Sequence, residues 1–152
     1  MRYANRTTVS PDRSKMEIER TLSRYGASEF IYAARPDQAA IQFKLSDRII
    51  RFRLPLHGWK DFKTSEKGRS RRDGAAQKAW GLDVRRRFRA LALVLKAKLE
   101  AVESKITTFE EEFYAHVLLP NGKTVYEETG GKVALAYEKG EVPMMLEFKQ
   151  SK

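Results

Sequence analysis

Apolar residues recur with a helical period along the middle of the chain. From Trp80 to Ile106 they follow one another at spacings of three or four residues, which places them on one face of a helix. We therefore expect one long helix from Gly74 to about Lys105. Its apolar face is long enough for a coiled-coil-like pairing, but the favoured interpretation is a helix that spans its own domain. Four of its side chains are then expected in the core: Trp80, Phe88, Leu91 and Leu95.

The pattern before this helix predicts a shorter helix and then strands. Residues 10–12, Ser-Pro-Asp, are typical of a helix start, and Gly26 is typical of a helix end. The segments that follow are rich in strand-forming residues or alternate between apolar and polar ones, which predicts three strands at 29–34, 41–45 and 50–56. We expect an antiparallel sheet whose apolar face packs against both helices and whose other face carries cations.

The last third of the chain predicts three further elements. Thr108 and Glu111 have the spacing of a capping box and indicate a helix start. Asn121-Gly122 indicates a small hairpin, and Gly130-Gly131 is expected to interrupt the chain before a short helix at 132–139. The sequence thus predicts a single α+β domain in three parts: a flexible arm at 1–9, an α-β-β-β-α core at 10–106, and an extension of the same domain at 107–152 with a helix, a hairpin and a short helix.

Composition limits the classes of protein that fit. The chain has 152 residues, 41% of them hydrophobic, which suits one domain with a real core. It has no cysteine, which excludes disulfides, thiolate zinc sites and a cysteine nucleophile. It shows no apolar run of about 18 residues and no signal-peptide pattern, so we expect a cytoplasmic protein.

Positive charge is concentrated between Lys60 and Lys98. This stretch holds 13 Lys and Arg against four Asp and Glu, so its net charge of +9 accounts for most of the +10 of the whole chain. Such a concentration is typical of surfaces that bind a polyanion, and nucleic acid is the commonest polyanion in a cell. Together with the strand cations it gives the predicted nucleic-acid-binding residues: Lys44, Arg51, Arg53, Lys60, Lys63, Lys67, Arg69, Arg71, Arg72, Lys78, Arg85, Arg86 and Arg89.

Each part of this set also has a purely structural interpretation. The strand cations suit an open, solvated sheet face, and the run from Lys67 to Arg72 suits a solvated loop within 57–73. The same run lies just before a helix start, where free N–H groups and Arg side chains bind phosphate. Trp59 and Phe62 suit base stacking, but anchoring of the loop to the core is the favoured interpretation.

The sequence gives little support for catalysis. Glu112 and His116 are spaced to share a helix face and to supply two metal ligands, but nothing identifies the carboxylates that would complete a magnesium site. Acids in the first turn of a helix also stabilise its dipole. No nucleophile elbow or phosphate-binding glycine motif is present. We therefore expect a protein that is not an enzyme and has no metal or cofactor.

Six segments of the chain carry a family resemblance. They are VS at 9–10, EIERTLSRYGA at 17–27, RALAL at 89–93, KAKLEAVE at 96–103, ITTFEEEF at 106–113 and LPNG at 119–122. Together they resemble small proteins encoded by tailed phages and prophages, and the likeness covers most of the chain. That family has no established activity, so the resemblance implies a setting, the cytoplasm of an infected or lysogenic bacterium, and no site residues.

The order helix, three strands, helix is also that of the double-stranded RNA-binding domain. The loop glycine of that domain and the Lys-Lys pair that opens its second helix are not cleanly present here. Arg71, Arg72 and Lys78 imitate that pair, so the likeness is one of topology alone.

From the charge pattern we expect a phage-encoded, non-catalytic nucleic-acid-binding protein of DNA replication or recombination. It would recognise mainly the phosphate backbone, with weak sequence preference. The alternative is an interaction protein that inhibits a host defence complex, in the manner of an anti-CRISPR protein. Its basic face would then compete for the acidic residues of a host protein or capture a guide RNA. The sequence does not indicate whether the bound nucleic acid is DNA or RNA. No membrane partner is expected.

Overall fold

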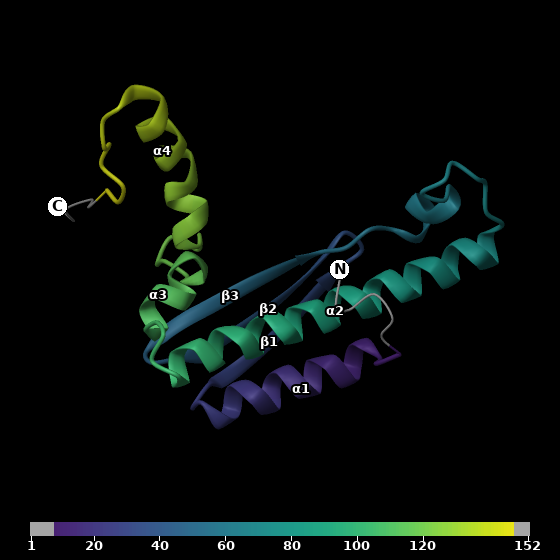
Figure 1. The fold of residues 1–152 in the computed structure, drawn as a ribbon, viewed down its shortest axis with the longest axis horizontal. Helices are drawn as coiled ribbons and strands as arrows, with labels where there is room; N and C mark the ends of the chain where they lie inside the picture. The colour runs from purple at the N-terminus through teal and green to yellow at the C-terminus, as the bar shows by residue number, and fades with distance from the viewer. Residues whose placement is uncertain (1–7, 148–152) are drawn as a thin grey trace.

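Residues 8–147 are described by the computed structural model, which shows an α+β fold (Figure 1). Its elements in chain order are α1 (Pro11–Arg24), β1 (Ser28–Arg35), β2 (Gln38–Leu45), β3 (Arg48–Pro55), η1 (Trp59–Lys63), α2 (Asp73–Glu103), α3 (Phe109–Phe113), η2 (Tyr114–His116) and α4 (Val125–Lys139). The predicted α+β class and the order helix, three strands, long helix are confirmed. Residues 1–7 of the predicted arm lie outside the described residues.

The three strands form one antiparallel sheet in the order β1-β2-β3. The turn between β2 and β3 is Ser46-Asp47, and both residues have positive φ, as the tight turns that suit the twist of a hairpin require. Every second residue of β2 is buried, and its Ile41 lies opposite Phe52 of β3. This alternation gathers the apolar side chains on one face of the sheet, as predicted.

Both α1 and α2 cover that apolar face (Figure 1). The core contains Ile18 of α1 and Phe88, Leu91 and Leu95 of α2, and all four are at most 8% exposed. Full burial of such a side chain stabilises a fold by roughly 1.5–3 kcal/mol. Burial of Phe88, Leu91 and Leu95 is therefore predicted correctly from the spacing along the long helix.

The long helix α2 extends well past the sheet that it covers. Its 31 residues span about 46 Å, whereas the eight residues of β3 span about 26 Å. The first half of α2 therefore lies beyond the strands (Figure 1), and Trp80 is 38% exposed. The prediction that Trp80 is buried is wrong for this reason. At the other end, α2 stops at Glu103, so Ile106 falls outside the helix and is 81% exposed.

The segment 57–73 is more regular than the sequence indicates. It holds the 3-10 helix η1 and a bridge between Thr64 and Ser70. η1 packs on the projecting half of α2, where Ala76 is fully buried. Arg87 of α2 donates to the carbonyl of Pro55 at 2.8 Å and so fixes the end of β3. The expectation of an irregular loop is thus corrected.

The C-terminal part contains the predicted small hairpin, which also extends the sheet. Leu118 pairs with Thr124 across the turn, and Val117 forms an antiparallel bridge to Ile50 of β3. The prediction of a break at Gly130-Gly131 is wrong, because α4 runs through both glycines without interruption. Thr124 accepts from the Glu127 N–H in a capping box, which starts the helix seven residues before the expected 132–139.

α4 rises from the end of the sheet opposite the projecting half of α2 (Figure 1). It has 15 residues, of which only Val125 is buried. Within residues 8–147, no helix combines the length and the apolar character that a bilayer span requires.

Candidate nucleic-acid interface

Residues 63–72 form a small ordered hairpin, here called the basic hairpin. The Arg71 N–H donates to the Lys63 carbonyl at 2.7 Å, and the Ser65 N–H donates to the Arg69 carbonyl at 2.8 Å. Gly68 closes the turn with a φ of +75°, a conformation that favours glycine. The hairpin leads directly into α2, whose N-cap is Arg72. The charges that the sequence places here therefore sit on a defined backbone.

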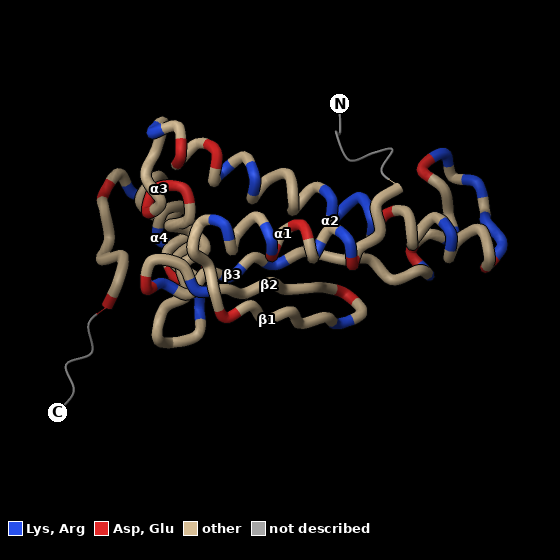
Figure 2. The backbone as a smooth tube through the Cα atoms, turned by 90° about the horizontal axis from the view of Figure 1, so that it is seen from below, with Lys and Arg blue, Asp and Glu red and all other residues tan. Residues whose placement is uncertain are grey.

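Five of the predicted cations form an exposed group at this end of the molecule. Figure 2 shows Lys and Arg gathered along the basic hairpin, at the end of the molecule away from α4. All five are exposed, and none has an acidic partner within 4.0 Å among the described residues. The charge of this group is thus available to a polyanion. Its members are Lys60, Lys67, Arg69, Arg72 and Lys78.

Two further cations of the basic hairpin hold it in place. Lys63 lies 3.2 Å from the carboxylate of Asp73 and 5.3 Å from the ring centre of Trp59. Arg71 donates to the carbonyl of Phe62 at 3.1 Å. Asp73 lies in the first turn of α2, where a negative charge is favoured by the helix dipole. Lys63 and Arg71 are thus engaged within the chain, so the exposed side chains are the better candidates for phosphate contacts.

The aromatic residues of this end are placed as anchors. Trp80 donates its indole N–H to the carbonyl of His57 at 2.8 Å, and His57 lies edge-on to Phe62 with ring centres 6.3 Å apart. Trp59 and Phe62 of η1 are half-buried, and η1 packs on α2. The aromatic residues therefore anchor the segment, but they attach it to the projecting half of α2 and not, as the favoured interpretation expected, to the core.

The strand cations lie on the other face of the sheet, and each has an intramolecular partner. Lys44 lies 3.4 Å from the carboxylate of Glu29, and Arg53 lies 3.2 Å from that of Glu127. Arg51 donates to the side-chain oxygen of Gln42 and to the carbonyl of Gly122. These contacts reduce the charge that the strand cations offer to another molecule.

A shallow hollow of about 320 Å³ covers this outer sheet face. Its lining includes Arg51, Arg53 and also Arg35, which sequence reasoning missed. Arg35 lies opposite Gln38 in the β1–β2 register, and the alternation of β2 could have placed it on the polar face. The hollow is separate from the basic hairpin, so the predicted residues form two groups and not one surface.

The cations on the flank of α2 are more enclosed than expected. Arg89 donates to the carboxylate of Glu17 on α1, and its side chain is 26% exposed. Arg85 and Arg86 are half-buried, and the Nε of Arg85 is fully buried. The expectation of a freely exposed row of arginines therefore does not hold for Arg85 and Arg89.

Glu112 and His116 point to different partners. The carboxylate of Glu112 lies 3.1 Å from Lys98 Nζ, and the ring of His116 stacks on Phe52 at 3.9 Å. Burial, followed by the nearby charge of Lys98, lowers the pKa of His116. Within residues 8–147, no three His, Cys, Asp or Glu side chains lie close enough to hold a metal ion.

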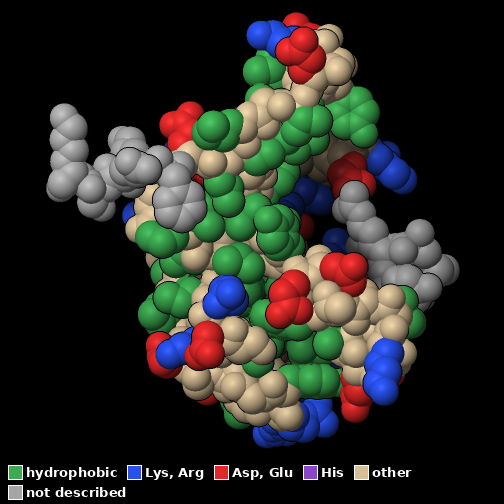
Figure 3. Space-filling model, turned by 90° about the vertical axis from the view of Figure 1, so that its left-hand side faces the viewer, with side chains coloured by type: hydrophobic (Ala, Val, Ile, Leu, Met, Phe, Trp, Pro, Cys, Tyr) green, Lys and Arg blue, Asp and Glu red, His purple; other side chains and the backbone are tan. Residues whose placement is uncertain are grey.

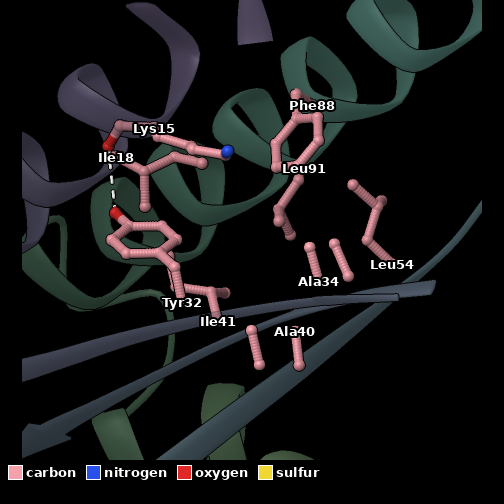
Figure 4. A pocket seen from close by; sticks show the side chains of 11 residues that line it. Lys15, Ile18, Tyr32, Ala34, Ala40, Ile41, Leu54, Phe88 and Leu91 are labelled. Atoms are coloured by element: carbon pink, nitrogen blue, oxygen red, sulfur yellow. Dashed lines mark hydrogen bonds between the residues drawn. The ribbon is translucent and has the colours of Figure 1, made fainter. Parts of the chain in front are cut away.

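An apolar recess of about 150 Å³ lies between the two helices and the sheet (Figure 4). Tyr32 donates its hydroxyl to the Lys15 carbonyl at 3.1 Å, and burial raises the pKa of Tyr32 to about 12. Phe88, Leu54 and Ala34 complete much of the wall. The recess has about the volume of a single aromatic ring, and its lining is mostly apolar.

None of the protein-family models, curated proteins or solved structures compared with this chain matches it.

Proposed function

We propose that this protein is a non-catalytic nucleic-acid-binding protein of phage DNA metabolism. Its phosphate-binding surface consists of η1, the basic hairpin and the start of α2. The observation that carries the proposal is the group of five exposed cations without acidic partners at one projecting end of the molecule. A phosphate backbone that binds such exposed charges releases the counterions condensed along it, which favours binding.

The other predicted cations are weaker candidates for phosphate contacts than those at the projecting end. Lys44, Arg53 and Arg89 already contact carboxylates of the same chain. A phosphate would have to compete with Glu29, Glu127 or Glu17 for them. We therefore place the primary contacts on Lys60, Lys67, Arg69, Arg72 and Lys78, and assign the strand cations a secondary role.

Five contacted phosphates define the expected salt dependence. The logarithm of the association constant should fall with the logarithm of salt concentration with a slope of about −4 to −5 on duplex DNA. The slope should be about −3 to −4 on a single strand. Backbone contacts of this kind carry little sequence information, so different sequences of one length should bind with similar affinity.

The test is a titration of labelled single- and double-stranded DNA and RNA of equal length, at four salt concentrations. Double-stranded RNA belongs in the set because the helix–strand–strand–strand–helix order is shared with a domain that binds it. The test variant replaces Lys67, Arg69 and Arg72 by Gln. The matched control replaces three exposed cations from the other end, Arg20, Arg24 and Lys139, by Gln.

On duplex DNA, the salt slope of the hairpin variant should be smaller than that of the wild type by about three units, and its affinity at low salt should be at least tenfold lower. The control variant should keep most of the wild-type slope and most of the wild-type affinity. Equal losses in the two variants would mean that net charge alone drives binding and would refute the proposed surface. A flat salt response in the wild type would remove the nucleic-acid proposal and favour the inhibitor of a host defence complex.

A further inference from the structure

The apolar recess of Figure 4 follows from two alanine residues in the sheet. Ala34 of β1 lies directly opposite Ala39 of β2, and Leu54 of β3 continues the same row across the sheet. The neighbouring row on this face holds the much larger side chains of Tyr32 and Ile41. The two small side chains leave a space of about 150 Å³ between the sheet and the helices, which the described side chains do not fill.

The recess has an apolar interior and a polar mouth. Ile18, Phe88 and Leu91 line it from the two helices and are at most 8% exposed. Tyr32 is 36% exposed and the side chain of Lys15 is 33% exposed, so these two residues mark the side that opens to solvent. Figure 4 shows the Lys15 side chain reaching across the space toward Phe88, and its Nζ lies 5.0 Å from the centre of that ring. A cation therefore stands at the entrance of an apolar space.

The recess differs from the other apolar surface of the molecule in being enclosed. Figure 3 shows hydrophobic side chains gathered over the rising arm that α4 forms and continuing into the body below it. Tyr126 and Tyr137 of this helix are 68% and 89% exposed. Such an open surface contacts a small ring on one side only, whereas the recess contacts it from the sheet and from two helices. A small apolar ligand therefore makes more contacts in the recess.

Two properties of the recess point to such a ligand. A close-packed core rarely keeps a space of this size, because a cavity lowers stability in proportion to its volume. An apolar cavity of about 150 Å³ holds one benzene-sized ring. The ammonium group of Lys15 at the entrance favours a ring that carries a negative charge. We propose that the recess binds a small aromatic carboxylate, with its ring between the sheet and the two helices and its carboxylate on Lys15 Nζ.

The acidic neighbour of Lys15 leaves room for this contact. The carboxylate of Asp12 lies 3.6 Å from Lys15 Nζ, and its side chain is 90% exposed. A strong charge-assisted hydrogen bond is shorter, at about 2.7–2.9 Å, and exposed ion pairs contribute little to stability. An ammonium group also has three N–H donors, so it can bind a ligand carboxylate while Asp12 remains nearby or turns into water. The Tyr32 hydroxyl already donates to the Lys15 carbonyl, which leaves Lys15 Nζ as the donor at the mouth.

The volume of the recess limits the ligand to a single ring. Pockets for larger ligands enclose about 300–1,000 Å³, so a nucleotide does not fit here. The ligand is therefore distinct from the nucleic acid of the proposed function, and the inference does not rest on that function. For a probe as small as benzoate we expect a Kd of about 0.1–1 mM.

The first experiment measures benzoate binding to the full chain by isothermal titration calorimetry near pH 7, where benzoate is charged. Benzyl alcohol has the same ring without the charge, benzylamine has the opposite charge, and acetate has the carboxylate without the ring. Benzoate should bind at least threefold more tightly than benzyl alcohol and at least tenfold more tightly than benzylamine or acetate. No binding of benzoate up to about 10 mM, or binding of any of the other three as tight as that of benzoate, overturns the proposal.

Variants that fill the recess test its position. Ala39→Leu extends a side chain into the space and should lower benzoate affinity at least tenfold. Ala40→Leu is the matched control and should keep the wild-type affinity, because the Ala40 side chain lies on the other side of the sheet (Figure 4). If Ala39→Leu does not fold, Ala34→Val narrows the recess from the same row and replaces it in the test. Unchanged benzoate affinity in the filled variant, or an equal loss in the control, refutes the site.

The charge at the mouth is tested separately. Lys15→Met keeps an apolar stem and removes the ammonium group, so it should bind benzoate and benzyl alcohol with similar affinity. A preference for benzoate that survives in Lys15→Met would contradict the contact with Lys15.

Chemical-shift mapping by NMR locates the bound ligand directly. On addition of benzoate, the amide signals of Ile18, Ile41 and Leu91 should move, and those of the basic hairpin should not. The hairpin variant, which lacks three of the exposed cations, should bind benzoate as the wild type does. Benzoate binding and nucleic-acid binding can therefore fail independently of each other. Shifts confined to the basic hairpin or to the outer face of the sheet would mean that surface cations bind benzoate as a simple anion, and would refute the proposal.

Discussion

Arg89 of the long helix α2 donates a hydrogen bond to the carboxylate of Glu17 on α1. A cation that the sequence assigns to nucleic-acid binding therefore joins two helices of the core. Glu17 is 39% exposed and Arg89 is 26% exposed, so water screens the pair only in part. The contact distinguishes cations that hold the fold together from cations that remain available to a partner.

This pair gives a prediction about stability. Arg89→Gln should lower the free energy of unfolding by roughly 1 kcal/mol, the upper part of the range for partly exposed ion pairs. Arg89→Glu should cost more, because two carboxylates then face each other. Urea unfolding followed by circular dichroism measures both. The double variant Glu17→Arg/Arg89→Glu restores the pair in reverse and should recover most of the loss. A double variant less stable than either single one would show that the two side chains do not interact as described.

The second prediction separates the core half of α2 from its projecting half. Leu95→Ala should destabilise the protein by roughly 2–5 kcal/mol, because Leu95 is 1% exposed and its removal leaves a cavity. Trp80→Ala should cost less despite the larger side chain, because Trp80 is 38% exposed and lies on the projecting half of α2, where its indole N–H donates to the His57 carbonyl. Thermal unfolding of both variants checks the order. The reverse order would mean that the projecting end and the core unfold as one tightly coupled unit.

The third prediction concerns pH. Burial and the nearby Lys98 lower the pKa of His116 in the folded protein, whereas the unfolded chain binds a proton near the ordinary value of 6.5. The unfolded state therefore binds more protons as the pH falls below about 6.5, and stability is lost there.

His116→Phe keeps a ring on Phe52 and removes the titration. It should lose less stability than the wild type between pH 7.5 and pH 5. If the stability of the wild type and of His116→Phe fell in parallel with pH, His116 would be excluded as the source of the stability lost at acid pH.

The fourth prediction compares the two groups of candidate binding residues. Lys44→Gln with Arg53→Gln should reduce nucleic-acid affinity less than Lys67→Gln with Arg69→Gln. The reason is that the strand cations already contact Glu29 and Glu127. Both double variants remove two charges, so a difference between them reports position and not net charge. A larger loss from the strand pair would move the binding surface to the outer sheet face.

Local patterns were sufficient for most of the fold. The alternation around Ile41 and Phe52 gave the strands, and the caps at Ser10 and Thr108 gave two helix starts. Trp80 could not be placed correctly, because a helical period identifies the apolar face and not the point at which the neighbouring sheet ends. The break predicted at Gly130-Gly131 is wrong for another reason. Glycine weakens a helix by an amount that a capping box and intact backbone hydrogen bonds can offset.

The candidate site was predictable in location and not in detail. Charge density along the sequence identified the projecting end, since most of its cations are close neighbours in the chain. Which cations are paired depends on residues far away in sequence, as Arg53 with Glu127 and Arg89 with Glu17 show. Contacts of this kind leave no local signal. The assignment of nucleic-acid binding to the five exposed cations remains a prediction.

The projection of α2 beyond the sheet has a consequence for how the molecule loses structure. Residues 57–82 share few contacts with the core, since η1 packs on α2 and not on the strands. Such a segment is expected to open on its own, at a lower free energy than the core around Leu95. Amide hydrogen exchange should therefore be faster in the first turns of α2 than in its second half. A protein stressed by heat or denaturant would lose its cationic end first, while probes of the core still report the native state.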